Sequence, residues 1–341
     1  MKLTTVSLLK FLFGIVLFVG VAVGAFLFIG WPSKTKGTIY GVTFSRPYAE
    51  ELKLDPDRVL TVALDEVGVR RFRIPAYWGL LETKPDTWDF TQLDKDIDAI
   101  GQRNGKVILA VGEKLPRWPE CWGPDWWKKM PATEQHAPLM KYIETVVTRY
   151  RNNPAIQGWQ IENEPHFQYG DCPSIDLNAL KQEVNFVRGL DPSRPITTTD
   201  SGELSAWTTF DGLIDSLGVS VYRVVRNPLF GSWNVCYWFV PPYLYERKAL
   251  LAKWVAGVKD VYVSEFQMEP WSNKSLEQTP ISDQMSSMSP QQMTSNFSFA
   301  ERMGMPSVDF WGIEWWEWMR ETQGHPEYID IAKAFWKTHQ P

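Results

Sequence analysis

The sequence predicts an α/β protein, a single (β/α)8 barrel preceded by an N-terminal transmembrane helix. Short apolar segments alternate with amphipathic stretches eight times over about 300 residues. Each segment is apolar along its length, as buried parallel strands are, and eight strand–helix units close a (β/α)8, or TIM, barrel. The predicted strands are Thr38–Phe44, Val69–Ile74, Lys106–Gly112, Ile156–Asn163, Pro195–Thr199, Leu217–Tyr222, Asp260–Glu265 and Ser307–Ile313.

The stretches between the predicted strands have the apolar spacing of amphipathic helices. A doubly wound open sheet is the alternative arrangement, but no Gly-rich phosphate loop follows the first predicted strand. One closed barrel is therefore favoured. The repeating apolar positions are Leu93, Ile97 and Ile100; Met140, Ile143, Val147 and Tyr150; Leu180, Val184 and Val187; Leu250, Trp254 and Val258; and Ile329, Ala332 and Phe335.

The N-terminal apolar run decides where the barrel is expected to reside. Phe11–Ile29 carries no charge and is long enough to cross a bilayer as a helix, and Trp31 follows as an interfacial residue would. A cleaved signal peptide is the alternative, with Val23–Ala25 resembling a cleavage site. The apolar run continues past that site, which favours an uncleaved anchor. The barrel is thus expected outside the cytoplasm, membrane-anchored, or secreted if the segment is cleaved.

Charge and aromatic content indicate which kinds of ligand the protein can bind. The formal net charge of −5 provides no basic face for nucleic acid. The chain has 18 Trp, and because Trp is bulky and its N–H needs a partner when buried, we expect some to fill the core. For a subset of them the alternative is a groove lined with indole rings, where the C–H faces of sugar rings stack.

The three cysteines are too few to define a disulfide framework, and their spacing indicates no metal site. Cys121 and Cys172 follow the third and fourth predicted strands, whose loops lie side by side in a parallel barrel. In an oxidising compartment these two are predicted to form a disulfide, leaving Cys236 free. Three unpaired thiols are the alternative.

Carboxylates end two of the predicted strands. The fourth ends in Glu162, Asn163 and Glu164, and the seventh ends in Glu265. In such barrels the chemistry lies where strands end, and these two strands aim carboxylates at a common centre. Two facing carboxylates are what cleavage of a glycosidic bond requires. The alternative is that they are ion-paired residues at strand ends.

With these residues the chain resembles a clan A retaining glycoside hydrolase, similar to the family 5 cellulase-like enzymes. Asn163-Glu164-Pro165 matches the Asn-Glu-Pro motif that ends the fourth strand in that clan. The resemblance implies that Glu164 is the general acid/base and that Asn163 contacts the sugar 2-hydroxyl. It also implies that Glu265 is the nucleophile of a double displacement.

The resemblance assigns further supporting residues one at a time. Arg73 matches the Arg that ends the second strand, which implies a bidentate hold on Glu265. Tyr222, at the end of the sixth strand, resembles the Tyr that hydrogen-bonds the nucleophile; a core Tyr is the alternative. A Trp platform under the reacting sugar follows the eighth strand in the clan, and Trp315 is chosen over Trp316.

Glu162 is a second candidate for the general acid, beside Glu164. Side chains alternate along a strand, so Glu162 and Glu164 are both expected to face the same way. The Asn-Glu-Pro motif decides for Glu164. His166 is expected to support Glu164 or bind sugar, with an ordinary loop histidine as the alternative. Trp118, in the loop after the third strand, is expected to form a wall of the groove.

The sequence thus predicts a retaining glycosidase acting on a β-linked oligo- or polysaccharide, without a cofactor, a metal or an obligate protein partner. A non-catalytic carbohydrate-binding barrel and a transglycosylase are the alternatives, and the identity of the sugar stays open. The expected organisation is a short segment 1–10, an anchor 11–30, a tether 31–37 and a catalytic domain 38–341.

Overall fold

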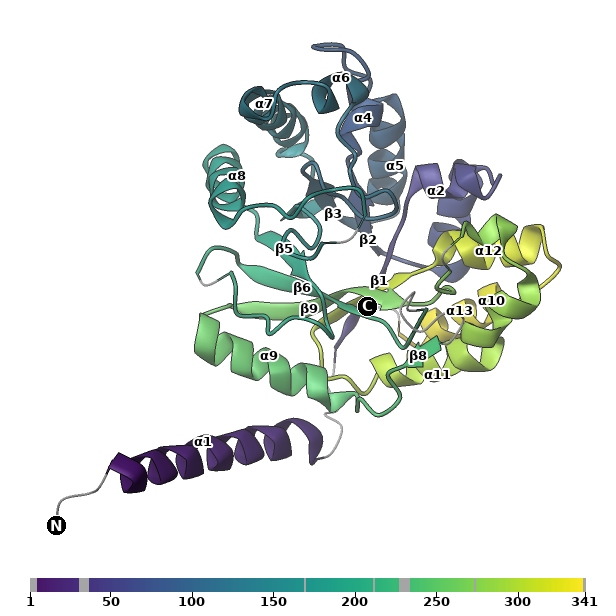
Figure 1. Ribbon diagram of the computed structural model, residues 1–341. Coiled ribbons are helices and arrows are strands. Elements are labelled where there is room, and N and C mark those ends of the chain that lie inside the picture. The colour runs from purple at the N-terminus through teal and green to yellow at the C-terminus, as the bar shows by residue number, and fades with distance from the viewer. Residues whose placement is uncertain are drawn as a thin grey trace.

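The computed structural model describes residues 5–30, 37–168, 170–210, 212–226, 234–272 and 274–339. Eight parallel strands close into a barrel, with the last strand, β10, pairing back onto β1 (Figure 1). The predicted fold class is confirmed. The barrel strands are β1 (Ile39–Thr43), β2 (Arg71–Pro75), β3 (Lys106–Val111), β4 (Ile156–Ile161), β5 (Ile196–Asp200), β6 (Ser216–Val221), β9 (Asp260–Gln267) and β10 (Ser307–Trp311).

Helices surround the barrel and bury their apolar faces against it. In α5, for example, the predicted positions Leu93, Ile97 and Ile100 are all buried. Met288 and Met293, in the polar stretch after β9, are fully buried between helices, so this stretch belongs to the folded core. The elements outside the strands are α2 (Arg46–Glu51), α3 (Pro56–Thr61), η1 (Val62–Val67), α4 (Trp78–Leu81), α5 (Thr91–Gln102), α6 (Asp125–Lys128), α7 (Ala132–Tyr150), α8 (Leu177–Leu190), α9 (Tyr243–Ala256), η3 (Leu276–Gln278), α10 (Ile281–Ser287), α11 (Pro290–Ala300), α12 (Ile313–Glu321) and α13 (Glu327–Thr338).

Helix α9 departs from the predicted pattern. Its repeating positions Leu250 and Trp254 are exposed, at 52% and 84% of their surface. The helix instead buries a face of small residues, which permits close approach to the barrel strand β9. The predicted helix is present, but Leu250 and Trp254, two of its three repeating positions, do not face the core, whereas the third, Val258, is buried just beyond the helix. The buried residues of α9 are Tyr245, Ala249, Ala252 and Ala256.

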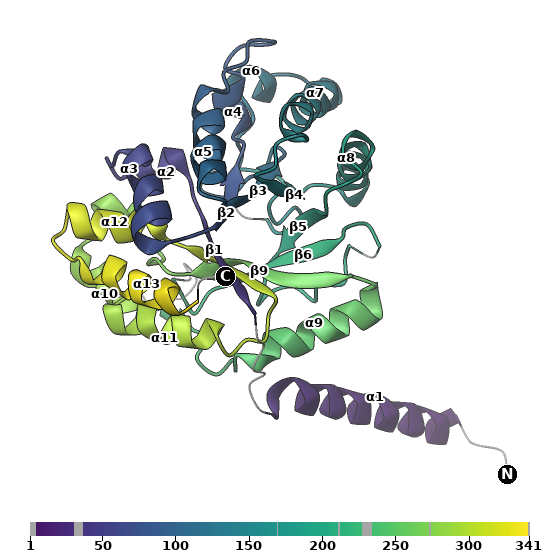
Figure 2. The same cartoon turned by 180° about the vertical axis from the view of Figure 1, so that it is seen from behind.

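Helix α1 (Thr5–Phe28) stands apart from the barrel and lies beyond α9 in both views (Figures 1 and 2). Its segment Leu9–Phe28 has a mean hydropathy of 2.7, and none of it is buried. It is long and apolar enough to cross a membrane. The predicted tether and Trp31 lie outside the described residues, apart from residue 37.

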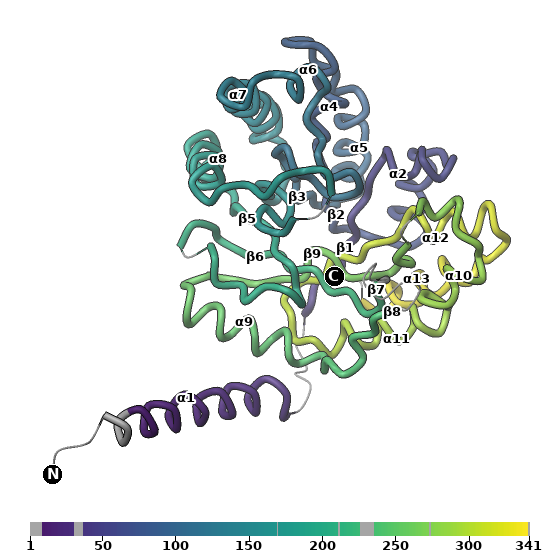
Figure 3. Tube along the Cα trace, in the orientation of Figure 1, coloured from purple at the N-terminus to yellow at the C-terminus, as the bar shows by residue number. Residues whose placement is uncertain are grey.

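Loops after β3, β4 and β6 build the rim of the barrel. Cys121 and Cys172 form a disulfide with Cα atoms 5.1 Å apart, so the predicted bond between the third and fourth loops is confirmed. Cys236 is a free thiol. It ends the two-stranded hairpin of β7 (Val224–Arg226) and β8 (Asn234–Cys236), traced in Figure 3.

Candidate active site

A groove of about 900 Å³ opens among the loops that follow the barrel strands. Segments after β1, β3, β6 and β9, and the last residue of β10, contribute to its walls. Its lining combines indole and phenol rings with carboxylates, the combination suited to stacking a sugar ring and bonding its hydroxyls. Aromatic lining residues are Tyr48, Trp118, Trp122, Tyr222, Trp271 and Trp311, and acidic ones are Glu51, Glu120, Glu265 and Glu269.

Glu265 lies on β9 at the bottom of this groove. Its Oε1 accepts a hydrogen bond from Arg73 Nη1 at 2.7 Å, and its Oε2 accepts one from the Tyr222 hydroxyl at 3.0 Å. Each carboxylate oxygen therefore has its own donor, one of them cationic. Such donors fix the orientation of the carboxylate.

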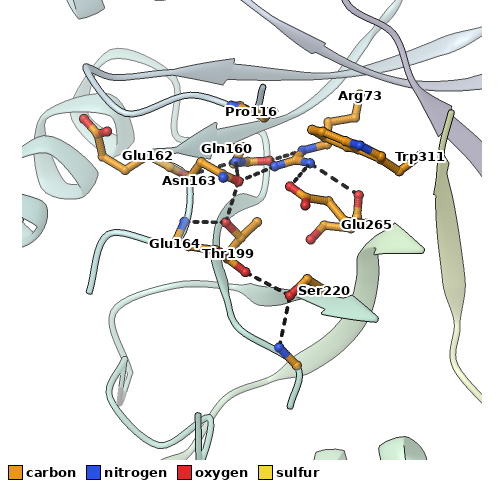
Figure 4. Close-up of polar contacts among 12 residues, drawn as sticks. Arg73, Pro116, Gln160, Glu162, Asn163, Glu164, Thr199, Ser220, Glu265 and Trp311 are labelled. Atoms are coloured by element: carbon orange, nitrogen blue, oxygen red, sulfur yellow. Dashed lines mark hydrogen bonds and ion pairs between the residues drawn. The ribbon is translucent and has the colours of Figure 1, made fainter. Parts of the chain in front are cut away.

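The buried guanidinium of Arg73 connects the ends of three strands (Figure 4). Besides Glu265 on β9, it donates to Gln160 Oε1 and to Asn163 Oδ1, both at 2.6 Å. The predicted contact with Glu265 is present, but only one nitrogen of Arg73 bonds that carboxylate. Gln160 was not predicted; it is the last residue but one of β4 and is fully buried.

Glu164 follows β4 and is held by β5 and β6. Its backbone N–H donates to Thr199 Oγ1 at 2.7 Å, and the Thr199 hydroxyl donates to Asn163 Oδ1 at 2.9 Å. Its carboxyl Oε1 accepts from the Ser220 hydroxyl at 2.9 Å. Burial raises the pKa of Glu164 well above its usual value, and the nearby Glu265 adds to this effect. This environment favours the protonated carboxyl group.

Glu162 points away from the groove (Figure 4). Its oxygens accept from the backbone N–H groups of Glu113 at 2.8 Å and Lys114 at 2.7 Å. The carboxyl group occupies the space beside Gly112, where a Cβ atom would lie 2.3 Å from it. Strand β4 has already ended, and Glu162 and Glu164 have φ values of 58° and 43°. The expectation that strand alternation turns both the same way is therefore wrong.

Another carboxyl group that lines the groove, Glu120, was not predicted. It is 6% exposed, and its Oε2 lies 3.2 Å from Lys114 Nζ. Lys114 also donates to the carbonyl oxygen of Glu164 at 3.0 Å. Burial, aided by the charge of Glu265, raises the pKa of Glu120 to about 8 against the opposing effect of Lys114. Glu120 is therefore electrostatically linked to both predicted catalytic residues.

Trp311, not Trp315, lines the groove. Strand β10 ends at Trp311, whose indole N–H donates to Glu269 Oε1 at 2.8 Å. Trp315 is fully buried within α12 and donates to Gln284, so the choice of Trp315 as sugar platform is wrong. Trp316 is equally buried. Strand β10 ends at Trp311 and α12 begins at Ile313. The sequence pattern did not predict this early change from strand to helix.

Arg117 packs against the ring of Trp311. Its guanidinium lies 4.0 Å from the Trp311 ring centre and 3.7 Å from that of Tyr48. It also bonds Glu269 and, at 2.9 Å, Glu314. This buried ion cluster fixes the indole plane that faces the groove.

The two remaining predicted residues have different settings. Trp118 is 63% exposed at the rim of the groove, where a wall was expected. His166 Nδ1 lies 3.0 Å from the carbonyl oxygen of Ile175, and its ring stacks on Phe210. His166 therefore packs within the loop after β4 and is not among the residues that line the groove. Across the described ranges, no group of three or more His, Cys, Asp or Glu side chains is arranged to hold a metal ion.

Parts of the sequence are similar to parts of known glycoside hydrolases. No family profile matches the chain. The mannan endo-1,4-β-mannosidase A of Podospora anserina is 36% identical over 120 residues, 34% of this chain and 31% of that protein. The β-galactosidase BgaA of Clostridium cellulovorans is 26% identical over 173 residues, 42% of this chain and 25% of that protein. The match spans less than a third of either relative.

Solved structures match over most of the chain. A family 5, subfamily 18 glycoside hydrolase from Streptomyces cattleya, in complex with GlcNAc, has a TM-score of 0.59 at 14% identity. The match covers 90% of this chain and 82% of that one. Xylanase 10B from Thermotoga maritima has a TM-score of 0.54 at 15% identity, covering 81% and 83%. The chain resembles clan A glycoside hydrolases. The predicted resemblance is confirmed.

Proposed function

We propose that this chain is a retaining β-glycoside hydrolase that cleaves the O-glycosidic bonds of a β-linked oligo- or polysaccharide. The contrast between two carboxyl groups carries the proposal. Glu265 has a cationic donor on one oxygen and a hydroxyl donor on the other. Glu164 is buried and has a raised pKa. The first environment suits a nucleophile held in one orientation, and the second suits a protonated acid.

In the first step Glu164 would donate its proton to the leaving oxygen while Glu265 attacks the anomeric carbon. The bond from that carbon to the leaving group breaks, and an ester to Glu265 forms. Arg73 and Tyr222 would keep the attacking carboxylate oriented, because each already bonds one of its oxygens.

In the second step water would attack the ester, with Glu164 as the base. Glu265 is one cause of the raised pKa of Glu164. Once Glu265 is esterified its negative charge is gone, so the pKa of Glu164 falls and it can accept a proton from water. The same electrostatic link thus serves both steps.

The sugar would stack on Trp311 and be bonded through Asn163. Asn163 Oδ1 already accepts from Arg73 and Thr199, so its amide N–H2 is the group that would meet a sugar hydroxyl. The names of the matched relatives make β-mannosides and β-galactosides the first substrates to test. A transglycosylase would use the same residues, with a second sugar replacing water.

We further propose that α1 anchors the barrel, residues 38–341, outside the cytoplasm. Its apolar segment is unburied and long enough to span a bilayer. The full chain should stay with membranes under high salt and alkaline washing, since surface charge does not hold such a helix. A mature amino terminus at or near Phe26 would instead identify a cleaved signal peptide.

The stereochemical course of the reaction tests the proposed mechanism. A panel of aryl β-glycosides, mannans and galactosides should reveal a substrate, and the first product observed by NMR should be the β anomer. A trapped glycosyl ester should map to Glu265. An inverted product would overturn the double displacement, and binding without turnover of any substrate would favour the non-catalytic barrel.

A further inference from the structure

Large apolar side chains gather on the outer side of α9. Beyond residue 30, the described chain exposes nine large apolar side chains, and five of these lie on α9 or in the segment leading into it. Leu250 and Trp254 are one helical turn apart and share a stripe. The five are Trp238, Phe239, Leu250, Trp254 and Val255.

The same stripe of α9 holds the end of α1. The Tyr243 hydroxyl donates to the carbonyl oxygen of Phe28 at 2.9 Å, and Arg247 Nη1 donates to that of Ile29 at 2.6 Å. Carbonyls in the last turn of a helix lack partners within the helix, so these side chains cap α1. Positions 243, 247, 250 and 254 follow the three- and four-residue spacing of one helix face. The α1 contact and the exposed apolar residues are therefore continuous.

We propose that this stripe, Tyr243, Arg247, Leu250 and Trp254, here called the α9 face, lies on the surface of the lipid bilayer. The inference rests on the proposed anchoring role of α1. If α1 spans the bilayer, its last turn reaches the interface, and the residues that cap it are there too. Tyr, Trp and Arg are the side chains that favour this interface, because each has an apolar body and a polar end.

Apolar contact, not lipid charge, would hold the α9 face. The lysines near the end of α9 are already paired with acidic residues: Lys253 with Asp260 at 2.9 Å and Lys259 with Asp215 at 2.6 Å. Such pairs leave little net positive charge for anionic headgroups. Docking should therefore persist in neutral lipid and at high salt.

The consequence for the enzyme is its orientation. Helix α9 follows the barrel wall, so a bilayer along α9 places the barrel on its side. The groove would then open along the membrane surface, toward glycans that lie beside the bilayer. A barrel held only by its tether would have no fixed orientation.

Spin labels on the full chain in lipid nanodiscs, one copy per disc, test the proposal. Cys236→Ser removes the free thiol, and a label is placed by Leu250→Cys or by Leu80→Cys. These two leucines are equally exposed, at 52%, but Leu80 lies on α4, away from α1. The ratio of oxygen to nickel-complex collisions should be several-fold higher at position 250, as for a label in lipid, in both neutral and anionic discs.

Equal, aqueous ratios at both positions, with the protein still in the disc, would overturn the docking while leaving the anchor intact. Loss of the protein from the discs on alkaline washing would instead refute the anchor. Lipid-like values at position 250 that arise only with several copies per disc would indicate self-association and also overturn the proposal.

Trp254→Glu provides a second, functional check. A carboxylate at this position should lower the lipid exposure of a label at position 250, because burying it at the interface is unfavourable. Turnover of a soluble aryl glycoside should be unchanged, since Trp254 is exposed and does not line the groove. An unchanged label would count against docking.

Discussion

Glu162 and Glu164 are two positions apart on the chain, yet their carboxyl groups belong to two different pairs. Glu164 is close enough to Glu265 to be affected by its charge, and Glu265 lines the groove. Glu162 is close to Glu183 of α8, behind β4. Burial raises the pKa of Glu162, Glu164 and Glu183 alike. A buried carboxyl group with a raised pKa is therefore not enough to identify a catalytic acid.

The two pairs of carboxyl groups differ in the hydrogen-bond donors that contact them. Glu164 and Glu265 are bonded by side chains, namely Ser220 on Glu164 and Arg73 and Tyr222 on Glu265. Glu162 is bonded by backbone N–H groups of the loop after β3. We infer that the first pair performs chemistry and that the second stabilises the loop after β3.

The largest expected effect is the loss of turnover in Glu265→Gln. The amide cannot form the glycosyl ester, so activity should fall to background with every leaving group. Glu183→Gln is the matched control, since it removes a buried carboxylate from the other pair and should leave the rate nearly unchanged. Full activity in Glu265→Gln would reverse the comparison between the pairs.

The next effect separates Glu164 from Glu162. Glu164→Ala should lower kcat/KM by roughly 10²–10⁴-fold for substrates with poor leaving groups, because those need protonation. Activated aryl glycosides should be affected much less, and added azide should restore part of the rate. Glu162→Gln should retain the rate with both kinds of substrate. The opposite pattern would make Glu162 the acid.

The sequence predicted the barrel well, because eight buried parallel strands leave a repeated apolar signal. It also placed Glu164, Glu265, Arg73 and Tyr222 at strand ends, which the closed barrel brings together. These positions follow from the strand order alone. Their catalytic roles remain proposals.

Features that depend on how a strand ends were not predictable. The left-handed backbone at Glu162 breaks the alternation of side chains, and β10 changes to helix α12 within a few residues of Trp311. The apolar repeat of α9 did not predict its buried face for another reason. Alanines, not Leu250 and Trp254, pack that helix against the barrel. An apolar repeat by itself does not say whether a core or a membrane lies against it.

A smaller effect concerns stability. The pKa of Glu183 is about 8 in the folded chain and 4.5 ordinarily, so folding favours its protonated form. This contribution to stability is fully present below about pH 4.5 and is lost as pH rises through about 8, with a slope of at most about 1.4 kcal/mol per pH unit for one proton. Glu183→Gln should flatten this slope in urea unfolding measured from pH 5 to 8. An unchanged slope would show that the Glu162–Glu183 pair shares no such proton.

The smallest expected effect concerns Glu120, which lies between the two classes of carboxyl group. It lines the groove, but its nearest partner is the buried Lys114. Its pKa is about 8, so it is ionised at the alkaline end of the activity profile, where its charge helps to keep Glu164 protonated. Lys114 opposes this effect in part.

Glu120→Gln removes that charge while keeping the shape of the side chain. The pKa of Glu164 should then fall, and the alkaline limb of kcat/KM should move to lower pH by a fraction of a pH unit. Glu51→Gln is the control: Glu51 also lines the groove but is not among the groups that shift Glu164. A merely structural role for Glu120 would lower the rate at all pH values without moving the limb. A limb that moves equally in both variants would mean that the overall charge of the groove, not Glu120 in particular, sets the acidity of Glu164.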